Sequence, residues 1–120
     1  MTSMTLKEVA TMVASIGYPY AYDHFIDGTA QDPPFVVFFY EYSPMYADGA
    51  NYSDVRTLNI ELATDNKDFT AEAAVESVLS SNDLAWAKAE EYIETEQLYE
   101  VVYSADIVIR EEDTDGNEQN

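Results

Sequence analysis

The chain has 120 residues, no cysteine, and 24 Asp and Glu against 5 Lys and Arg, which gives a formal net charge of -19. The lack of cysteine excludes thiolate catalysis, Cys-ligated zinc and a disulfide framework. The acid excess has the wrong sign for the phosphate contacts that dominate nucleic-acid affinity, so we expect no direct DNA or RNA binding and no membrane docking. Because 47% of the residues are hydrophobic and 13% are aromatic, the chain can still form a folded core.

One domain over residues 1–109 and an acidic, disordered C-terminal tail over residues 110–120 are expected, because the tail holds five acids and no aromatic residue. Lys7 and Glu8 interrupt the first apolar residues, which is unlike a signal peptide. The longest strongly apolar run, 35–40, is far shorter than the roughly 20 residues that span a bilayer. These features predict a soluble, cytoplasmic protein.

The first predicted element is an amphipathic helix over residues 5–16. Thr5 followed by Glu8 has the spacing of a capping box, in which each side chain binds a free backbone N–H at the helix start. Gly17 suits the left-handed position that ends many helices, and Pro19 prevents continuation. A short extended segment over residues 20–25 and a proline-containing loop follow.

Two strands are predicted next, over residues 35–42 and 55–63. The first is apolar at successive positions, which predicts a strand covered on both faces. The second alternates, with Thr57, Asn59 and Glu61 on the face opposite its apolar residues. Residues 43–52, which lie between the two strands, carry Pro and Asp-Gly turn signals and form an excursion or hairpin tip.

A second helix and a hairpin complete the predicted order. Asp68 or Thr70 caps the helix, Glu72 faces water, and Asn82 is a left-handed stop. The hairpin joins residues 84–93 to residues 98–109. The fold class is therefore α+β: a single domain with a mainly antiparallel sheet of four to five strands packed by two helices, in the order α-β-β-β-α-β-β.

Catalytic and metal-binding patterns are weak throughout. In an extended segment Asp23 and Asp27 share one face while the only histidine, His24, points to the other, so the three cannot converge on a metal. Four scattered glycines give no phosphate-binding loop, and the acids of residues 90–96 fit a solvated hairpin face. We expect no enzyme, no cofactor and no metal.

Tyrosine gives the strongest functional signal in the composition. The chain has ten tyrosines, more than a core of this size can bury with every hydroxyl satisfied. Tyr46 and Tyr52 lie in the excursion, where rigid amphipathic side chains suit a protein–protein interface. This pattern predicts a protein that binds other proteins.

Eight short segments of the sequence are informative when they are compared together: residues 16–19, 21–25, 33–37, 47–48, 52, 60–65, 67–68 and 92–99. They resemble tail-terminator proteins, also called tail-completion or head–tail joining proteins, of long-tailed siphophages and prophages. The resemblance covers about residues 4–108.

The resemblance implies a hexameric ring that caps the tail tube, stops its polymerisation and forms the head–tail interface. Its implied partners are further copies of the chain, the major tail tube protein and the head–tail connector protein. Its implied location is the neck of the virion, after a period in the host cytoplasm.

The expected protein interface has two parts. One is the sheet face that the helices leave open, which a neighbouring subunit could cover; the other is the excursion between the two central strands. The residues of the two parts are Phe35, Val37, Phe39, Met45, Tyr46, Asp48 and Tyr52.

Two alternatives remain open at this point. The chain could be another neck protein, such as a head–tail joining or connector component, because such proteins are also small, acidic and α+β. It could instead be a small acidic DNA mimic that inhibits a host protein, although acids that alternate with apolar residues along strands are also typical of an ordinary solvated face.

Overall fold

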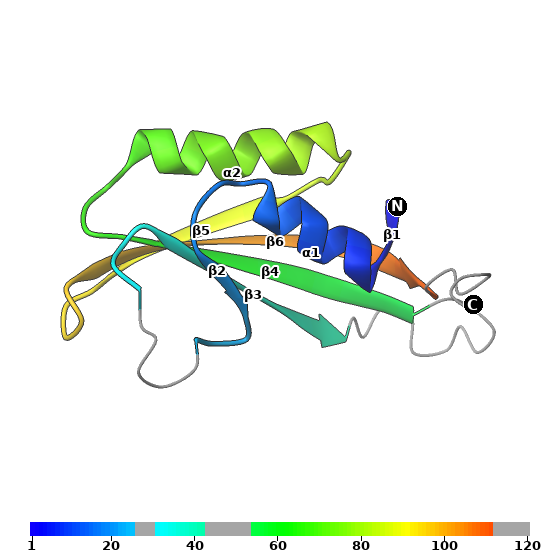
Figure 1. Ribbon diagram of the computed structural model, residues 1–120, viewed down its shortest axis with the longest axis horizontal. Coiled ribbons are helices and arrows are strands. Elements are labelled where there is room, and N and C mark those ends of the chain that lie inside the picture. The colour runs from blue at the N-terminus through cyan, green and yellow to red at the C-terminus, as the bar shows by residue number, and fades with distance from the viewer. Residues whose placement is uncertain (26–30, 43–53, 112–120) are drawn as a thin grey trace.

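A computed structural model describes residues 1–25, 31–42 and 54–111. Within these ranges six strands form one sheet, and two helices lie on one of its faces (Figure 1). The strands are β1 (Ser3–Thr5), β2 (Tyr20–Tyr22), β3 (Phe35–Tyr42), β4 (Asp54–Thr64), β5 (Ala87–Ile93) and β6 (Leu98–Arg110). The helices are α1 (Leu6–Ala14) and α2 (Phe69–Ser81).

The strand order is β1-β6-β4-β3-β2, and β5 pairs with β6 beside β1. The central pairs β3–β4, β4–β6 and β5–β6 are antiparallel, whereas β1–β6 and β2–β3 are parallel. The predicted α+β class is thus confirmed, but the sheet is mixed. No local pattern predicted β1, because three residues are too few to show a period and a parallel pair has no hairpin turn to mark it.

Helix α1 begins with the predicted capping box. The Thr5 hydroxyl accepts a hydrogen bond from the Glu8 backbone N–H at 3.0 Å, and the Glu8 carboxylate accepts one from the Thr5 N–H at 2.9 Å. Gly17, with φ of 101°, ends the helical segment in the left-handed region as predicted. The helix places Val9 and Val13 fully inside the core.

Replacing Thr5 with Ala removes the side-chain acceptor of this cap. We expect the free energy of unfolding to fall by about 1 kcal/mol, because Thr5 is buried and no water replaces the lost bond. Urea denaturation of the wild type and the variant measures the change. The Thr5→Ser variant keeps an acceptor oxygen and serves as the control; an equal loss in both variants would show that packing of the Thr5 methyl group, rather than the cap, is responsible.

Helix α2 confirms one predicted cap and corrects two expectations. Asp68 caps the helix by accepting a hydrogen bond from the Ala71 N–H at 3.0 Å. The left-handed residue after the helix is Asp83, with φ of 60°, whereas Asn82 has φ of -102°. Glu72 does not face water as predicted: it is 3% exposed, and its carboxylate turns toward Lys67 and Lys88.

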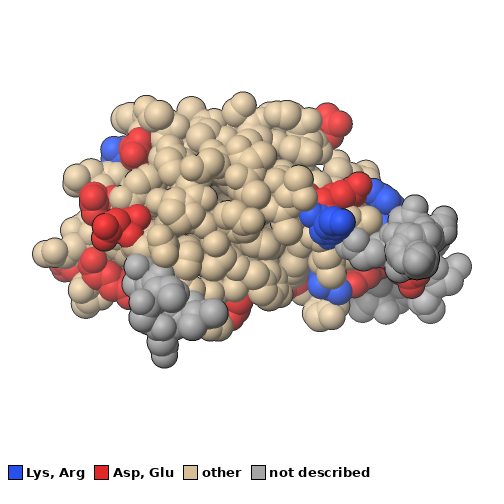
Figure 2. Space-filling model, in the orientation of Figure 1, with Lys and Arg blue, Asp and Glu red and all other residues tan. Residues whose placement is uncertain are grey.

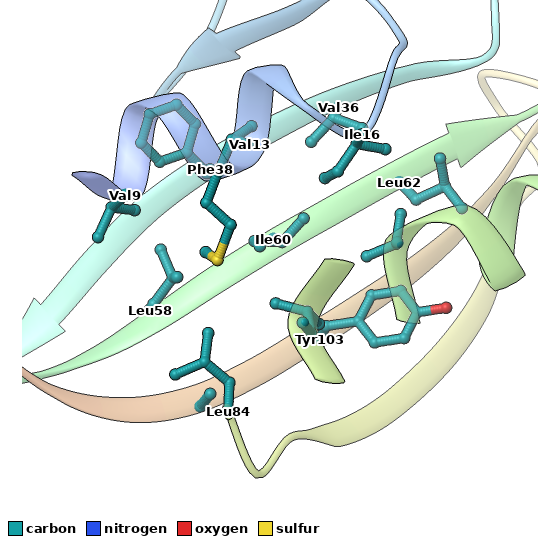
Figure 3. Close-up of a cluster of buried hydrophobic side chains, with 14 of the residues drawn as sticks. Val9, Val13, Ile16, Val36, Phe38, Leu58, Ile60, Leu62, Leu84 and Tyr103 are labelled. Carbon is teal, nitrogen blue, oxygen red and sulfur yellow. The ribbon is translucent and has the colours of Figure 1, made fainter. Parts of the chain in front are cut away.

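The core lies between the two helices and one face of the sheet (Figure 3). Alternate residues of β3, β4 and β6 point into it, and the predicted apolar face of β4 is confirmed. The largest fully buried side chains are Tyr103, Leu58, Ile60, Leu62, Leu79, Ile107, Val9, Val13, Val36, Val75 and Val101.

The opposite face of the sheet, which we call the open face, carries no helix of the described residues. On β3 its residues Phe35, Val37 and Phe39 are half-buried, whereas Val36 on the helix side is fully buried. The expectation that this strand is covered on both faces was therefore wrong for the described chain, because both helices pack on the same side. The predicted tail lies largely outside the described residues, and Arg110 belongs to β6.

Candidate functional site

The one histidine lies at the surface. His24 Nδ1 is 2.8 Å from Asp23 Oδ2, and both side chains are well exposed. Asp23 has φ of 69°, which breaks the extended backbone and brings the two side chains together, so the prediction that they point apart was wrong. Asp27 lies outside the described residues.

Among the residues that the structure describes, no group of three or more His, Asp or Glu side chains could hold a metal ion. Neither of the described helices has the length and apolar character of a membrane-spanning helix.

Polar side chains on the open face form a hydrogen-bonded row across three strands. The Asn59 amide donates to the Glu41 carboxylate at 2.9 Å, and the Ser104 hydroxyl donates to the Asn59 carbonyl oxygen at 2.7 Å. Next to it, the Thr57 hydroxyl donates to the Asp106 carboxylate at 2.6 Å. Asn59 is only 5% exposed, so these bonds satisfy a polar group that folding removes from water.

The open face is rich in acids; the one basic residue with its strand register, Arg110 at the end of β6, is bonded to Glu8 of α1 at 2.6 Å. Its strand register places five carboxylates there, which are Glu41, Glu61, Glu91, Glu100 and Asp106. Glu91 lies directly opposite Glu100 in the β5–β6 pair. Burial, followed by the charge of Glu100, raises the pKa of Glu61 above 4.5, and burial followed by Glu91 and Glu96 raises the pKa of Glu100. The folded chain thus holds several like charges close together.

Neutralising Glu100 should stabilise the protein. A carboxyl whose pKa is higher in the folded state than in the unfolded state contributes its full stabilisation when the pH is below the unfolded-state pKa. That contribution is lost as the pH rises above 4.5 and through the folded-state pKa. Glu100→Gln should therefore raise the free energy of unfolding at pH 7 by roughly 0.5 kcal/mol, since like charges directly opposite in a sheet are destabilising. Stability should also fall less steeply between pH 5 and 7 than in the wild type, by about the same amount.

Chemical denaturation at several pH values measures both effects. Glu94→Gln, in the exposed β5–β6 turn, makes the same charge change away from the open face. If the two variants gain equally, the effect belongs to the net charge of the chain rather than to the open face.

The apolar part of the open face contains three of the predicted interface residues. Phe35, Val37 and Phe39 lie together on β3, and the Phe35 ring packs edge-on against Phe25 with 5.4 Å between centroids. The other predicted interface residues, Met45, Tyr46, Asp48 and Tyr52, lie outside the described residues. The open face therefore joins an apolar strip on β3 to an acidic area on β4, β5 and β6.

On the helix side, two lysines and three glutamates form a network that attaches α2 to β5. Lys67 Nζ is 2.9 Å from Glu72 Oε1 and 2.8 Å from Glu90, while Lys88 Nζ is 2.8 Å from Glu72 Oε1 and 2.8 Å from Glu76. Tyr103 donates to Glu76, and hydrogen bonds to Lys88 and Tyr103 help to lower the pKa of that carboxyl. These groups hold α2 and the segment before it against β5 and β6, so the network is structural.

A third cluster, which we call the basic corner, lies where α1 begins. It contains three of the five basic residues and three exposed apolar or aromatic residues, which are Leu6, Lys7, Tyr22, Tyr42, Arg56 and Arg110. Figure 2 shows basic side chains gathered at this end of the molecule.

Aromatic rings hold the centre of the basic corner in place. The Arg56 guanidinium lies 5.4 Å from the Tyr40 ring centroid and 5.1 Å from that of Tyr42, and it pairs with Asp54 at 2.5 Å. Burial and the nearby Tyr22 raise the pKa of Tyr40 to about 12. A groove of about 340 Å³ beside it is lined by Leu6, Ala10, Tyr22, Phe38, Tyr40 and Arg56.

Sequence reasoning did not find the basic corner or the separation of charge between the two faces. The alternation along the predicted strand 55–63 did indicate part of the acidic face, because it places Glu61 on the same face as Thr57 and Asn59. The corner had no signal, since Leu6, Tyr22 and Arg56 come from three separate elements that only the tertiary fold brings together.

No protein-family model matches the chain, and no curated protein is similar to it in sequence. Among solved structures, the chain is similar to a chain of the virion of a native gene transfer agent (GTA) particle. The two share 18% sequence identity with a TM-score of 0.53, over 84% of this chain and 87% of the other. At this identity the likeness establishes a shared fold, and it covers nearly the full length of both chains.

Proposed function

We propose that this protein is a phage structural protein that caps the tail tube as a ring, ends tail polymerisation and forms the interface with the head. The observation that carries the proposal is the shared fold with a virion chain, over 84% of this chain and 87% of that one. The resemblance of residues 4–108 to tail-terminator proteins was found independently, from sequence segments alone. The proposed partners are further copies in a hexameric ring, the tail tube protein and the connector, and the role needs no catalysis, cofactor or metal.

The surfaces of the molecule suit such a role. An open sheet face with half-buried Phe35, Val37 and Phe39 leaves apolar area that another protein can cover. A net charge of -19 per copy makes direct attraction to DNA unfavourable, so a genome could pass a ring of these subunits without sticking to it. The subunit would wait in the host cytoplasm and join the neck of the virion during assembly.

Electron microscopy of lysates from the encoding phage or prophage, with this gene deleted, tests the role. A terminator predicts full heads beside tails of abnormal, variable length, because only loss of the cap lets the tube continue to grow. Tails of normal length that fail to attach to heads would instead assign the protein to head–tail joining. Intact virions would contradict a structural role, and complementation with the wild-type gene controls for effects on neighbouring genes.

A second candidate, a DNA mimic that inhibits a host protein, has one observation in its favour. The open face gathers five carboxylates, as a surface that imitates DNA would. The half-buried apolar strip on the same face argues against it, since DNA offers no matching apolar band. Tight, salt-sensitive binding of the purified protein to a host nuclease would favour this candidate.

A further inference from the structure

The sheet has one long free edge, which is the outer side of β5. Within the described chain, β1, β2 and β5 each pair with a single neighbouring strand. The first two have three residues each, and such short edge strands offer little to another chain, whereas β5 has seven. Residues 87–92 are all exposed, so no described element covers this edge.

The strand register shows which backbone groups of β5 face outward. Strands β1 and β5 lie on the same side of β6, because β4 occupies the other side. The Val108 N–H donates to the Thr2 carbonyl oxygen on that side at 2.9 Å, so the alternate residues 98, 100, 102 and 104 direct their N–H groups toward β5.

Opposite residues of an antiparallel pair exchange both backbone hydrogen bonds or neither. The β5 residues opposite those four are 87, 89, 91 and 93, and these therefore bond to β6. Lys88, Glu90 and Tyr92 present their N–H and C=O groups to the outer side, and no turn or loop of the described chain bonds to them. An added strand would satisfy all six groups.

The usual protections of a sheet edge are missing from β5. Its residues include no proline, and its pairing with β6 runs without a bulge. A lysine side chain often blocks an edge, but Lys88 is held on the helix side by Glu72 and Glu76 at 2.8 Å each. Glu90 is likewise held by Lys67 at 2.8 Å. Both charged side chains are thus drawn over the helix side of the strand, which leaves the outer backbone groups accessible.

The side chains at this edge favour a basic partner. Glu91 lies on the open face directly opposite Glu100, and neither forms an ion pair with a basic side chain of the described chain. Burial, followed by the charges of Glu91 and Glu96, raises the pKa of Glu100. Ala87 and Ala89 share this face and are small. A strand beside β5 would therefore place Lys or Arg next to Glu91 and apolar side chains over the two alanines.

A second copy of β5 is disfavoured as the occupant of this edge. Residues 87–96 contain four Glu and one Lys, so two such edges would bring acids of both copies together. Like charges that lie directly opposite in a sheet are destabilising. The charge of the edge therefore selects a different chain.

We propose that β5 binds an extended, basic segment of another protein, which adds to the sheet as a further strand. The outward backbone groups of Lys88, Glu90 and Tyr92 supply the hydrogen bonds, and the acids around Glu91 select the side chains. This inference goes beyond the tail-capping role and does not depend on it.

NMR titration of the ¹⁵N-labelled full chain with synthetic peptides tests the proposal. The probe is acetyl-Lys-Thr-Val-Thr-Val-Thr-Lys-amide, which reads the same in both directions and carries its Lys and Val residues on one face of a strand. It should shift the amide signals of Lys88, Glu90 and Tyr92 and slow their exchange with water. It should bind about tenfold more tightly than the same peptide with Glu in place of Lys.

Two controls separate strand addition from general attraction to an acidic protein. A peptide with Pro in place of the central Thr keeps the charge but interrupts a strand, so it should give no exchange protection at β5. Glu91→Gln should weaken binding of the Lys peptide by about threefold, whereas Asp65→Asn, the same charge change in an exposed loop, should have little effect.

Four results would overturn the proposal. They are equal binding of the Lys and Glu peptides, equal protection by the Pro peptide, no shift at β5 with about 5 mM peptide, and outward amides already protected in the free protein. The last result would mean that a second copy or another part of this chain occupies the edge. None of these results bears on the gene-deletion phenotype, so the tail-capping role stands or fails separately.

Discussion

Replacing Leu58 with Ala is expected to lower the free energy of unfolding by about 3–4 kcal/mol. Leu58 has no exposed surface and lies in the middle of β4, where it faces the core between the sheet and the helices (Figure 3). The cost combines the lost burial of the removed carbons with the cavity left behind, since neighbouring strands hold the backbone in place. A loss of this size is a large share of the 5–15 kcal/mol that typical domains possess.

Leu6→Ala is the matched control for that substitution. It makes the same chemical change on α1, where the leucine is 41% exposed, so the expected loss is below about 1 kcal/mol. Urea denaturation followed by circular dichroism measures both variants. Equal losses at the two positions would contradict the assignment of Leu58 to the core.

Removing the carboxylate of Glu72 is the second substitution with a large expected effect. Its Oε1 accepts from both Lys67 and Lys88, while its Oε2 is buried without a hydrogen-bond partner among the described atoms. We expect Glu72→Ala to cost about 2–4 kcal/mol, because it leaves two partly buried cations with fewer partners. A loss in the lower half of that range would result from the ion pairs that remain, because Lys67 keeps Glu90 and Lys88 keeps Glu76 as a partner.

A triple variant distinguishes a charge effect from a packing effect. Replacing Lys67, Glu72 and Lys88 together by Met, Leu and Met should recover most of the lost stability, since apolar residues of similar volume often replace a buried ion group without loss. Glu94→Ala, in an exposed turn, should change little. A triple variant as unstable as Glu72→Ala would show that the shape of the site, rather than its charge balance, sets the stability.

Local signals predicted most of the helices and strands correctly. Thr5, Glu8 and Gly17 marked the limits of α1 because caps depend on a few neighbouring residues. The period of two placed Leu58 and its neighbours in the core for the same reason. Strand β1 was missed because its partner β6 lies about a hundred residues away, and that pairing leaves no local pattern.

Longer-range features escaped prediction at Glu72 and at the basic corner. A glutamate in an amphipathic helix normally faces water, and only the tertiary placement of Lys67 and Lys88 makes burial of Glu72 favourable. Phe35, Val37 and Phe39 lie half-buried on the sheet face opposite the helices, and their use as an interface stays a prediction. Charge separation between the faces needed the strand register, which the sequence did not supply.

Electron cryomicroscopy of the neck of the purified parent virion tests the central claim most directly. We expect a sixfold ring of this chain between the last ring of the tail tube and the connector. A well-resolved neck in which no density fits this fold, with the protein absent from the virion by mass spectrometry, would contradict the proposed role.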